Sequence, residues 1–524
     1  MRQITRQFLL TLLFLPAVLS ASAQGNGMVR GNCTPSINPD EAMMARGQMQ
    51  QSALALQQPS KNWDASKVYR QMVILVTFSD KTFNTEAPVQ YYNRVFNEPG
   101  YNEGAGSGCM ADYFREQSSG MLNLQFDIYG PYQVESKAQP YDKPTGNTVN
   151  YGANTLREAT QKMVADHPNL DYKQYDWNGD GAINQVIYVY AGLSGNQGPG
   201  SYGHIWPNSS TFSTVTAPDG TAIRSYCCNG EMYIDNTLFG IGTLCHEFSH
   251  TLGLPDLYPT SSTSNYYSVV DEWDLMDGGN YTNKGWCPAN YTALEKMLMG
   301  WLTPVELTMP TTITDLKPVA EGGEAYIIQH TDNEFLLLEN RQWTGWDAGL
   351  PGRGLVIYHV DYDESVWRWN TVNNTNGHFR FDLVHADNLD YEDWNHLITS
   401  KKLSMYADTP YLHNRHLSTS AYPWTSDSTT SVNNALTDNS IPAATMFNEN
   451  AKGEKLLSKA ITNIQMSADG LISFDFMGGN PSAITAASCP SPENSNVYNI
   501  MGQRVTTPHK GLYIKNGKKY IKHH

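Results

Sequence analysis

The chain has 524 residues, 40% of them hydrophobic, which is enough for two or three domains with sizeable cores. Its formal net charge is −16, whereas a protein that binds nucleic acid is expected to present a basic face. The composition therefore argues against a nucleic-acid partner and fits an extracellular, cation-binding protein. The seven cysteines form an odd, scattered set that does not define a disulfide framework.

Residues 1–23 have the pattern of a secretory signal peptide. Arg2 and Arg6 precede an apolar run over residues 8–19, and small residues at 21–23 offer a cleavage site. The apolar run covers about twelve residues, whereas a transmembrane helix needs about twenty. We therefore expect a protein that is secreted or displayed at the cell surface, without stable membrane insertion.

Residues 24–66 are interpreted as a propeptide, because they are rich in Gln, Met, Ala and Ser and lack a substantial core. Cys33 lies in this segment, and its thiolate could ligate a metal until processing removes it. The alternative is an unstructured leader with an incidental thiol.

Residues 67–304 have the pattern of a mixed α/β catalytic domain. Residues 73–78 are a β-branched run typical of a buried strand, residues 112–117 indicate a helix, and residues 122–128 alternate as a strand does. Farther along, residues 291–302 indicate a helix that closes this domain before Pro304.

A candidate calcium loop lies at residues 176–184. Asp176, Asn178, Asp180 and Asn184 occupy positions 1, 3, 5 and 9 of an EF-hand-like pattern. Position 12 is Ile187 rather than a bidentate glutamate, so a bound Ca²⁺ would recruit other ligands. The pattern predicts a structural Ca²⁺ site, and the alternative is an Asx-rich turn between a helix and a strand.

The stretch HEFSHTLGLPD, residues 246–256, carries the chemistry of a zinc protease. On a helix, His246 and His250 lie four positions apart and project from one face, where both imidazoles can reach one Zn²⁺. Glu247 follows the first histidine, and a carboxylate there can take the proton of an attacking water. These are the roles of the HExxH motif.

The residues after this motif supply a third ligand. Gly253 falls where the helix must stop, a position that favours the left-handed conformation, and Asp256 follows ten residues after His246. The spacing resembles the metzincin pattern, with aspartate in place of the last histidine, and predicts a His₂Asp zinc site with an open fourth position. The alternative is an ordinary amphipathic helix with surface histidines.

Met276, in the stretch WDLMDGG, is a candidate Met-turn residue about twenty positions beyond Asp256. A methionine in a tight turn there could pack beneath the histidine ligands. The alternative is an ordinary core methionine. Gly278 stands where some metzincins carry a tyrosine, and Tyr281 is only a weak substitute.

Beyond residue 304 the chain is expected to be mainly β. Short strands are predicted at residues 325–329, 335–340, 354–361 and 472–476 of a β-rich domain spanning 305–478. Residues 479–496 have the composition of a linker. Residues 497–524 predict a small β module with strands near 497–500, 511–514 and 519–521 and a hairpin turn at 516–517.

The metal motif, the stretch WDLMDGGNY and several other segments resemble the immune-inhibitor-A-like family of secreted zinc metallopeptidases. The similarity covers roughly residues 70–480 and includes MVILVTFSD at 72–80, YDWNGDGAINQVIYVYAG at 175–192 and LPGRGLVIYHVD at 350–361. It implies a metzincin-like domain with His246, His250 and Asp256 as zinc ligands and Glu247 as acid/base. The C-terminal module is similar to those on exported Bacteroidota proteins, where related modules are sorting signals. A vestigial tag is the alternative.

The predicted fold class is therefore α+β: a metzincin-like catalytic domain with an active-site helix, a mainly β domain and a small C-terminal β module. The predicted function is that of a secreted zinc endopeptidase, made as a zymogen, that cleaves proteins or peptides. One alternative is an extracellular binding or adhesion protein with an inactive protease domain, and another is an exopeptidase or amidase with the same metal site. The sequence does not indicate an oligomeric state.

Overall fold

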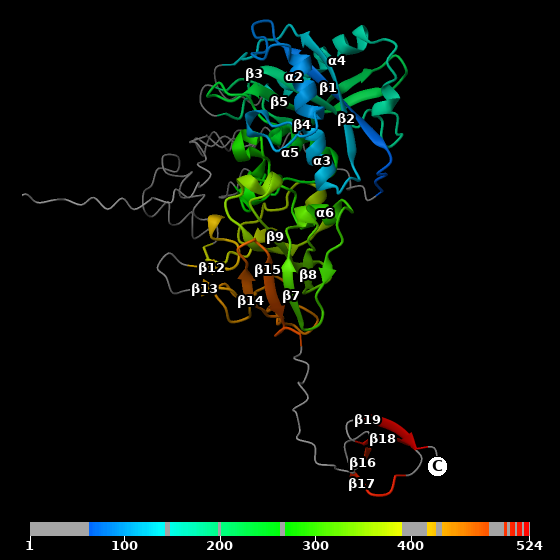
Figure 1. Ribbon diagram of the computed structural model, residues 1–524. Helices are drawn as coiled ribbons and strands as arrows, with labels where there is room; N and C mark the ends of the chain where they lie inside the picture. Colours follow the sequence, from blue (N-terminus) through cyan, green and yellow to red (C-terminus); the bar gives the residue numbers. More distant parts are fainter. Residues whose placement is uncertain are drawn as a thin grey trace, which may run out of the picture. The chain divides into compact units, whose positions relative to one another are not determined.

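The computed structural model describes residues 62–141, 147–197, 201–261, 268–389, 417–425 and 432–480, and near the C-terminus 497–499, 504–508, 511–515 and 518–522 (Figure 1). The predicted signal peptide and Cys33 lie outside these residues, as does the predicted turn at 516–517. The chain divides into two compact units, Met1–Gly479 and Asn480–His524.

The first sheet holds the N-terminal half of the large unit together. Its strand order is β2-β1-β3-β5-β4, in which the first four strands are parallel and β4 pairs antiparallel with β5. The bounds are β1 Val68–Thr77, β2 Asn123–Gln133, β3 Val186–Leu193, β4 Asn208–Thr216 and β5 Ala222–Met232. The strands predicted at 73–78 and 122–128 are thus confirmed as β1 and β2.

Helices cover both faces of this sheet, because residues of a strand alternate between its two sides. In β1, Val73 and Leu75 pack in the core with α2, α3 and α5, whereas Met72, Ile74 and Val76 pack in a second core with α4. The helices are α2 Pro88–Asn97, α3 Met110–Gln117, α4 Asn147–Asp166, α5 Gly242–Thr251 and α6 Ala293–Leu298. Short 3₁₀ segments are η2 Glu103–Ala105, η3 Tyr172–Tyr175, η4 Asp271–Trp273 and η5 Gly279–Gly285.

The C-terminal half of the large unit is mainly β, as expected. One sheet has the order β11-β10-β9-β8-β6, another has β14-β15-β7, and β12 pairs with β13. The strands are β6 Val305–Glu306, β7 Thr311–Leu316, β8 Tyr326–Gln329, β9 Glu334–Arg341, β10 Gly354–Asp361, β11 Phe381–Leu383, β12 Trp424–Thr425, β13 Val432–Asn433, β14 Ile461–Met466 and β15 Ile472–Phe476. Between them lie η6 Val319–Glu321, η7 Gly345–Gly349 and α7 Glu364–Arg368.

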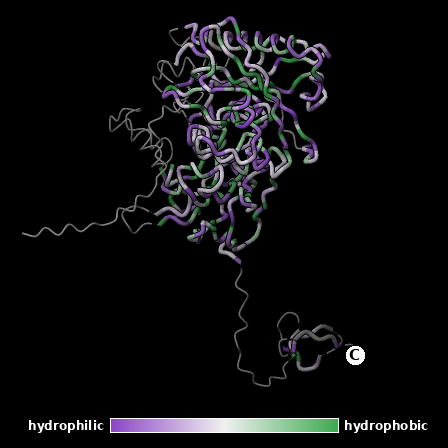
Figure 2. Tube along the Cα trace, turned by 45° about the horizontal axis from the view of Figure 1, so that its top comes forward, coloured by the Kyte–Doolittle hydropathy of each residue, from purple (hydrophilic) through white to green (hydrophobic). Residues whose placement is uncertain are grey.

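One apolar core runs across the predicted domain boundary at residue 304. Phe335 and Leu337 of β9 belong to the core that contains α3 and α5, whereas Leu336 and Leu338 face a third core with β7, β14 and β15. In Figure 2, hydrophobic stretches of the trace run through the interior of this unit. Since burial of apolar surface is the main force that stabilises folds, the two halves stabilise each other.

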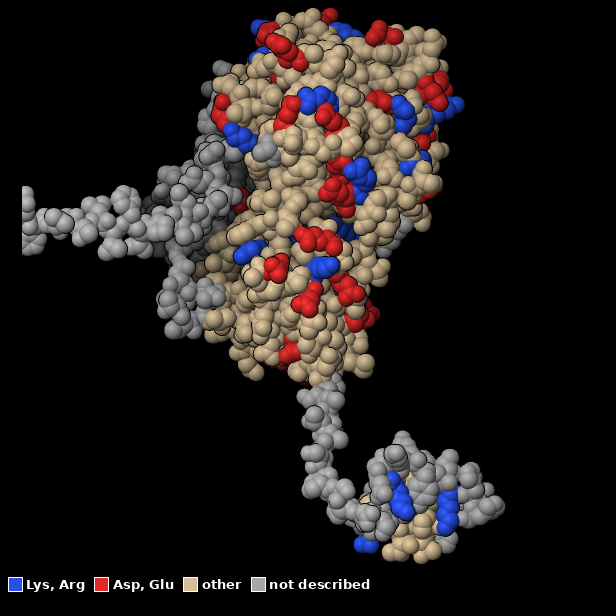
Figure 3. Space-filling view, viewed as in Figure 1, with Lys and Arg blue, Asp and Glu red and all other residues tan. Residues whose placement is uncertain are grey.

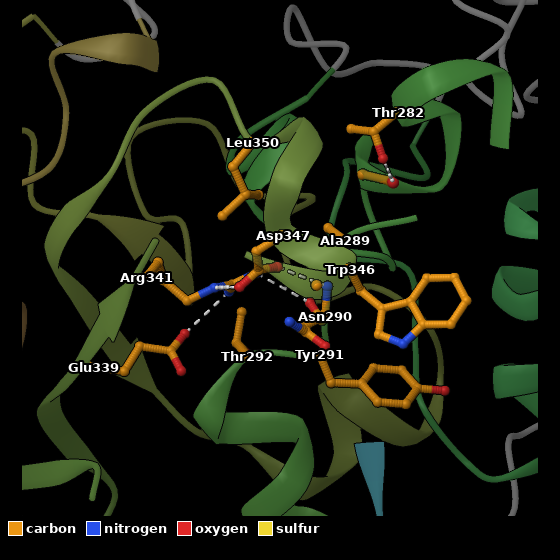
Figure 4. A network of polar contacts seen from close by, with 12 residues as sticks. Thr282, Ala289, Asn290, Tyr291, Thr292, Glu339, Arg341, Trp346, Asp347 and Leu350 are labelled. Atoms are coloured by element: carbon orange, nitrogen blue, oxygen red, sulfur yellow. Dashed lines mark hydrogen bonds and ion pairs between the residues drawn. The ribbon is translucent and has the colours of Figure 1, made fainter. Parts of the chain in front are cut away.

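A buried ionic network reinforces this junction (Figure 4). The guanidinium of Arg341, on β9, donates two hydrogen bonds to the Asp347 carboxylate, at 2.8 and 2.7 Å, and one to Glu339 at 3.1 Å. The backbone N–H of Asn290, which precedes α6, donates to Asp347 at 3.0 Å. The bidentate geometry fits a buried guanidinium–carboxylate pair, and it joins the segment before α6 to the β-rich half.

The described N-terminal residues already belong to the folded unit. Trp63 donates from its indole Nε1 to the carbonyl of Met299 at 2.9 Å, and its ring lies 5.8 Å from those of both Tyr69 and Trp301. Although the predicted propeptide extends to residue 66, its last residues therefore pack on the catalytic half.

The second unit contains a four-stranded antiparallel sheet of order β17-β16-β18-β19. Its strands are β16 Val497–Asn499, β17 Arg504–Val505, β18 Gly511–Lys515 and β19 Lys518–Lys522. The β module predicted for residues 497–524 is thus present.

Charged side chains of both signs are interspersed over the face drawn in Figure 3. Among the described residues, none of the helices is long and apolar enough to cross a membrane.

A buried carboxylate on β9 fixes a distant segment of the β-rich half. Glu334 accepts hydrogen bonds from His359 Nε2 at 2.8 Å and from the backbone N–H groups of Phe447 and Asn448 at 2.6 and 3.0 Å. Burial alone would raise the pKa of Glu334, but these hydrogen bonds lower it to about 2.

This carboxylate gives the first prediction. Its stabilisation is fully present above its unfolded pKa, near 4.5, and is lost as the pH falls towards 2. Glu334→Gln should therefore lower the free energy of unfolding by about 2 kcal/mol at pH 7, and by progressively less below pH 4.5. Urea unfolding at pH 7, 5 and 3.5 measures the change. The exposed Glu449→Gln is the control and should stay within about 0.5 kcal/mol at every pH.

Candidate metal centre

The helix α5 carries the HExxH motif into the core of the large unit. Its residues from Gly242 to Ser249 are all buried. Gly242 allows the close approach to η5, because a Cβ at this position would lie 2.0 Å from the carbonyl oxygen of Asn280. The motif therefore occupies an interior helix, which does not fit the alternative of an amphipathic helix with surface histidines.

The end of α5 turns the chain back as Gly253 predicts. Gly253 has φ +95°, and the backbone N–H groups of Leu254 and Gly253 donate to the carbonyls of Ser249 and His250 at 3.2 and 3.1 Å. These two hydrogen bonds form a Schellman motif, which requires the left-handed conformation at the glycine. The turn brings Asp256 back towards the helix.

The three predicted ligands converge. Nε2 of His246 lies 3.0 Å from Oδ1 of Asp256, and Nε2 of His250 lies 3.4 Å from the same oxygen. One potential ligand atom from each residue lies within 4.8 Å of the other two. The side chains of His246 and Asp256 are 0% and 1% exposed, whereas that of His250 is 9% exposed, so the cluster is most accessible beside His250.

Backbone carbonyls fix both imidazoles. Nδ1 of His246 donates to the carbonyl of Leu275 at 2.9 Å, and Nδ1 of His250 donates to the carbonyl of Leu254 at 2.8 Å. With Nδ1 hydrogen-bonded in this way, each Nε2 is directed at the centre of the cluster, as in histidines that bind metals. Two imidazole nitrogens and one carboxylate oxygen form a donor set that suits Zn²⁺.

The charges in the cluster attract one another strongly. Burial would lower the pKa of His250, but the Asp256 carboxylate raises it to about 9 and also raises the pKa of His246. Burial would raise the pKa of Asp256, but the two histidines hold it well below its usual range. A buried carboxylate that stays ionised provides the negative charge that a divalent cation needs.

Glu247 is buried beside the cluster, 1% exposed, on the side of the helix that faces β5. Burial, and after it the charge of Glu247, raises the pKa of the Cys227 thiol on β5. Cys245 on the same helix is fully buried. The five described cysteines are all buried free thiols.

The turn around Met276 lies against the metal cluster. Leu275 provides the carbonyl that holds His246, and the carbonyl of Met276 accepts a hydrogen bond from the N–H of Leu257 at 2.9 Å. Met276 itself is fully buried. This turn thus contacts both the helix and the segment that carries Asp256, and the Met-turn role of Met276 stays a prediction.

The same turn has no room for the tyrosine that some metzincins carry two residues later. A Cβ at Gly278 would lie 1.9 Å from Oδ1 of Asp271. The hydroxyl of Tyr281 accepts a hydrogen bond from Asn196 Nδ2 at 3.1 Å.

A pair of carboxyl groups lies beneath this turn. Oδ1 of Asp274 accepts the N–H of Met276 at 2.5 Å, and Oε2 of Glu295 accepts the N–H of Thr292 at 2.6 Å, which caps α6. Burial, and then the charge of Asp274, raises the pKa of Glu295 well above its ordinary value. Oδ2 of Asp274 and Oε1 of Glu295 are both buried without a hydrogen-bond partner, and a proton shared between the two carboxyl groups would relieve the repulsion of two buried negative charges.

The loop predicted to bind calcium is stabilised by its own hydrogen bonds. Asp176 accepts the backbone N–H groups of Gly179, Asp180 and Gly181 at 2.8, 3.2 and 2.8 Å. Asn184 accepts the N–H of Trp177 at 2.6 Å. This pattern agrees with the alternative of an Asx-rich turn, and the calcium site at Asp176, Asn178, Asp180 and Asn184 stays a prediction.

Residues 370–374, beyond β10, also contact the metal cluster, and the sequence patterns did not indicate this. Asn370 forms hydrogen bonds with both the backbone N–H and the carboxylate of Asp256. Asn374 accepts a hydrogen bond from the N–H of Thr260 at 2.7 Å. Asparagine in a polar loop is common, so its type and spacing carried no signal of a contact 114 residues away in sequence.

A buried HExxH helix and an aspartate that returns to its two histidines are features of a metallopeptidase catalytic domain. Residues 53–302 match the family model described as the immune inhibitor A peptidase M6, catalytic domain. This part of the chain is similar to that family of metallopeptidases, as the resemblance implied.

Curated relatives agree with this assignment. The chain is 28% identical over 297 residues to immune inhibitor A of Bacillus thuringiensis subsp. alesti, an alignment covering 48% of this chain and 43% of the relative. It is 25% identical over 314 residues to the pre-pro-metalloprotease PrtV of Vibrio cholerae serotype O1, covering 54% of this chain and 33% of the relative. The chain thus spans less than half the length of either relative.

The cluster predicts which residues hold a metal. Asp256→Ala and His250→Ala should each lower Zn²⁺ affinity by at least about 100-fold, because two donors remain of a three-residue set. Glu247→Gln should bind zinc within a few-fold of the wild type, since this side chain is not a ligand. Metal content after dialysis and chelator competition measure both effects. Stoichiometric zinc in Asp256→Ala would contradict the assigned ligand set.

Asp274 and Glu295 give a further prediction, in which stability depends on pH in the opposite direction to that expected for Glu334. Because the folded-state pKa of Glu295 is raised, its stabilisation is present below about pH 4.5 and is lost as the pH rises towards the folded-state value. In Glu295→Gln, the side-chain amide can donate a hydrogen bond to Asp274 at every pH, and its oxygen can still cap α6. Its melting temperature should equal or exceed that of the wild type at pH 8, and scanning calorimetry at pH 5 and 8 measures the difference. A large loss at both values would contradict a shared proton.

Proposed function

We propose that the protein is a secreted, zinc-dependent endopeptidase. The observation that carries this proposal is the paired geometry of His246 and His250, in which both Nδ1 atoms are bonded to carbonyls and both Nε2 atoms face Asp256. That arrangement suits a metal ligand set, in which outer hydrogen bonds orient the imidazoles. The match of residues 53–302 to the peptidase family model supports the peptidase class.

His246, His250 and Asp256 would hold the ion, and the bound Zn²⁺ would act as a Lewis acid on the scissile carbonyl and make water more acidic. Glu247 would accept the proton of the attacking water and transfer it to the leaving amine. Its place directly after the proposed ligand His246 on the buried helix favours this role, because the carboxylate then lies beside the metal site. Met276 and the Leu275 carbonyl would keep His246 in place during turnover.

The protein would be exported as a precursor, with residues 1–23 as signal peptide and the segment from residue 24 as propeptide. The name pre-pro-metalloprotease of the Vibrio relative supports such a precursor. Because Trp63 packs against Tyr69 and Trp301, processing would cut before Trp63 and leave this side chain on the mature enzyme. Cys33 would be lost with the propeptide, in agreement with a role as a latency ligand.

Two further assignments belong to this proposal. The C-terminal β module would act in export, as similar modules on Bacteroidota proteins do. Extracellular Ca²⁺ would stabilise the loop of Asp176 and Asp180, where carboxylate and amide oxygens are spaced suitably for a weak site.

Protein substrates are the proposed partners, and cleavage of an unfolded protein is the direct test. Processed enzyme should cut casein at internal peptide bonds, and Glu247→Gln should lower the rate by at least about 100-fold while keeping its zinc. Mass spectrometry of the products separates internal cuts from stepwise loss of terminal residues.

Each result separates the proposal from its alternatives. Removal of terminal residues only would indicate an exopeptidase. Full activity in Glu247→Gln would contradict the assigned role of this carboxylate. A zinc-loaded enzyme that cuts neither casein nor a peptide library would favour the binding-protein alternative.

A further inference from the structure

We propose that Asn370, in the β-rich half of the chain, is a positioning residue that orients the Asp256 carboxylate and thereby sets the zinc affinity of the centre. The inference rests on the proposed function, because it assumes that Asp256 is a metal ligand. It adds to that proposal a residue from outside the segment that matches the peptidase family model.

Asn370 contacts Asp256 at two points. Its Oδ1 accepts the backbone N–H of Asp256 at 2.6 Å, and its Nδ2 donates to Oδ2 of the Asp256 carboxylate at 2.6 Å. The other carboxylate oxygen, Oδ1, faces His246 and His250. One oxygen is therefore held by the asparagine amide while the other is directed at the position where a metal would bind.

Holding one oxygen of Asp256 in this way matters because a carboxylate can otherwise rotate about its last side-chain bond. The amide clamp fixes that rotation and the backbone at once, so the entropy of ordering the ligand is lost during folding rather than during metal binding. Outer hydrogen bonds of this kind orient metal ligands, and their removal commonly lowers metal affinity by about 10- to 100-fold. The donor also satisfies a buried carboxylate oxygen that would otherwise lack a partner.

The loop that carries Asn370 is built to hold it there. Asn370 follows α7 with φ +56°, a left-handed conformation that asparagine tolerates better than most residues. Asn373 donates from Nδ2 to the carbonyls of Leu257 and Phe381 at 2.7 and 2.8 Å, which ties the loop to β11 and to the residue after Asp256.

Asn374 provides a matched control from the same loop. Its Oδ1 accepts the N–H groups of Thr260 and Ser261 at 2.7 and 2.9 Å, so it holds the same returning segment without touching the Asp256 carboxylate. A role of Asn370 that is only structural would be shared by Asn374, whereas an orienting role would not.

The test measures Zn²⁺ affinity by competition with a chromogenic chelator, on purified metal-free protein. Asn370→Asp keeps the size, tolerates the left-handed backbone and replaces the amide donor by a second carboxylate. Asn370→Gly removes the side chain and also suits the positive φ. Both should weaken zinc binding by at least about 10-fold. Asn374→Asp keeps the acceptor for both N–H groups and should stay within about threefold of the wild type.

The outcomes distinguish failure of this inference from failure of the proposed function. Wild-type affinity in both Asn370 variants, or equal losses in Asn374→Asp, would overturn the positioning role while leaving the zinc centre intact. Absence of zinc binding by the wild type would overturn the proposed function itself. Circular dichroism and melting temperatures of the metal-free variants verify that each protein is folded.

Discussion

The structure depends on one constraint, which is the cost of burying two imidazoles and a carboxylate in an apolar core. Each of these groups must have a partner for every polar atom that does not face the centre. Leu275 in the Met-turn satisfies His246, Leu254 at the helix end satisfies His250, and Asn370 satisfies the outer oxygen of Asp256. Three separate segments must therefore fold correctly before the cluster can form.

This requirement accounts for the organisation of the large unit. The segments that hold the cluster come from both sides of residue 304, and one apolar core connects α5 with β9 and β10. The Arg341–Asp347 pair forms part of the same junction, where it contacts the residues just before α6. The β-rich half is thus structurally part of the site rather than an appended module.

The sequence predicted the parts of this arrangement that are local. His246, His250 and Asp256 were found because helix periodicity and the turn at Gly253 determine how near neighbours in sequence are placed. Strands such as β10 and β15 were predicted at their observed bounds, since Gly, Asp and Pro turns flank compact apolar runs.

The features that could not be predicted from the sequence depend on contacts between residues that lie far apart along the chain. The helix α4 was not predicted, because its buried face includes Thr155, Thr160 and Ala159 and its apolar periodicity is therefore diluted. The role of Asn370 could not be predicted either, since its partner Asp256 lies 114 residues away in sequence. The boundary at residue 304 was inferred from a change in composition, which does not show whether the segments share a core.

We propose that two histidines and one aspartate hold zinc in the processed enzyme. X-ray absorption at the zinc K-edge tests it most directly, because the spectrum reports the type of ligand atom and its distance. We expect two imidazole nitrogens and carboxylate or water oxygens at roughly 2.0–2.2 Å, with no sulfur. A sulfur shell at roughly 2.3 Å, or a spectrum without imidazole scattering, would contradict it.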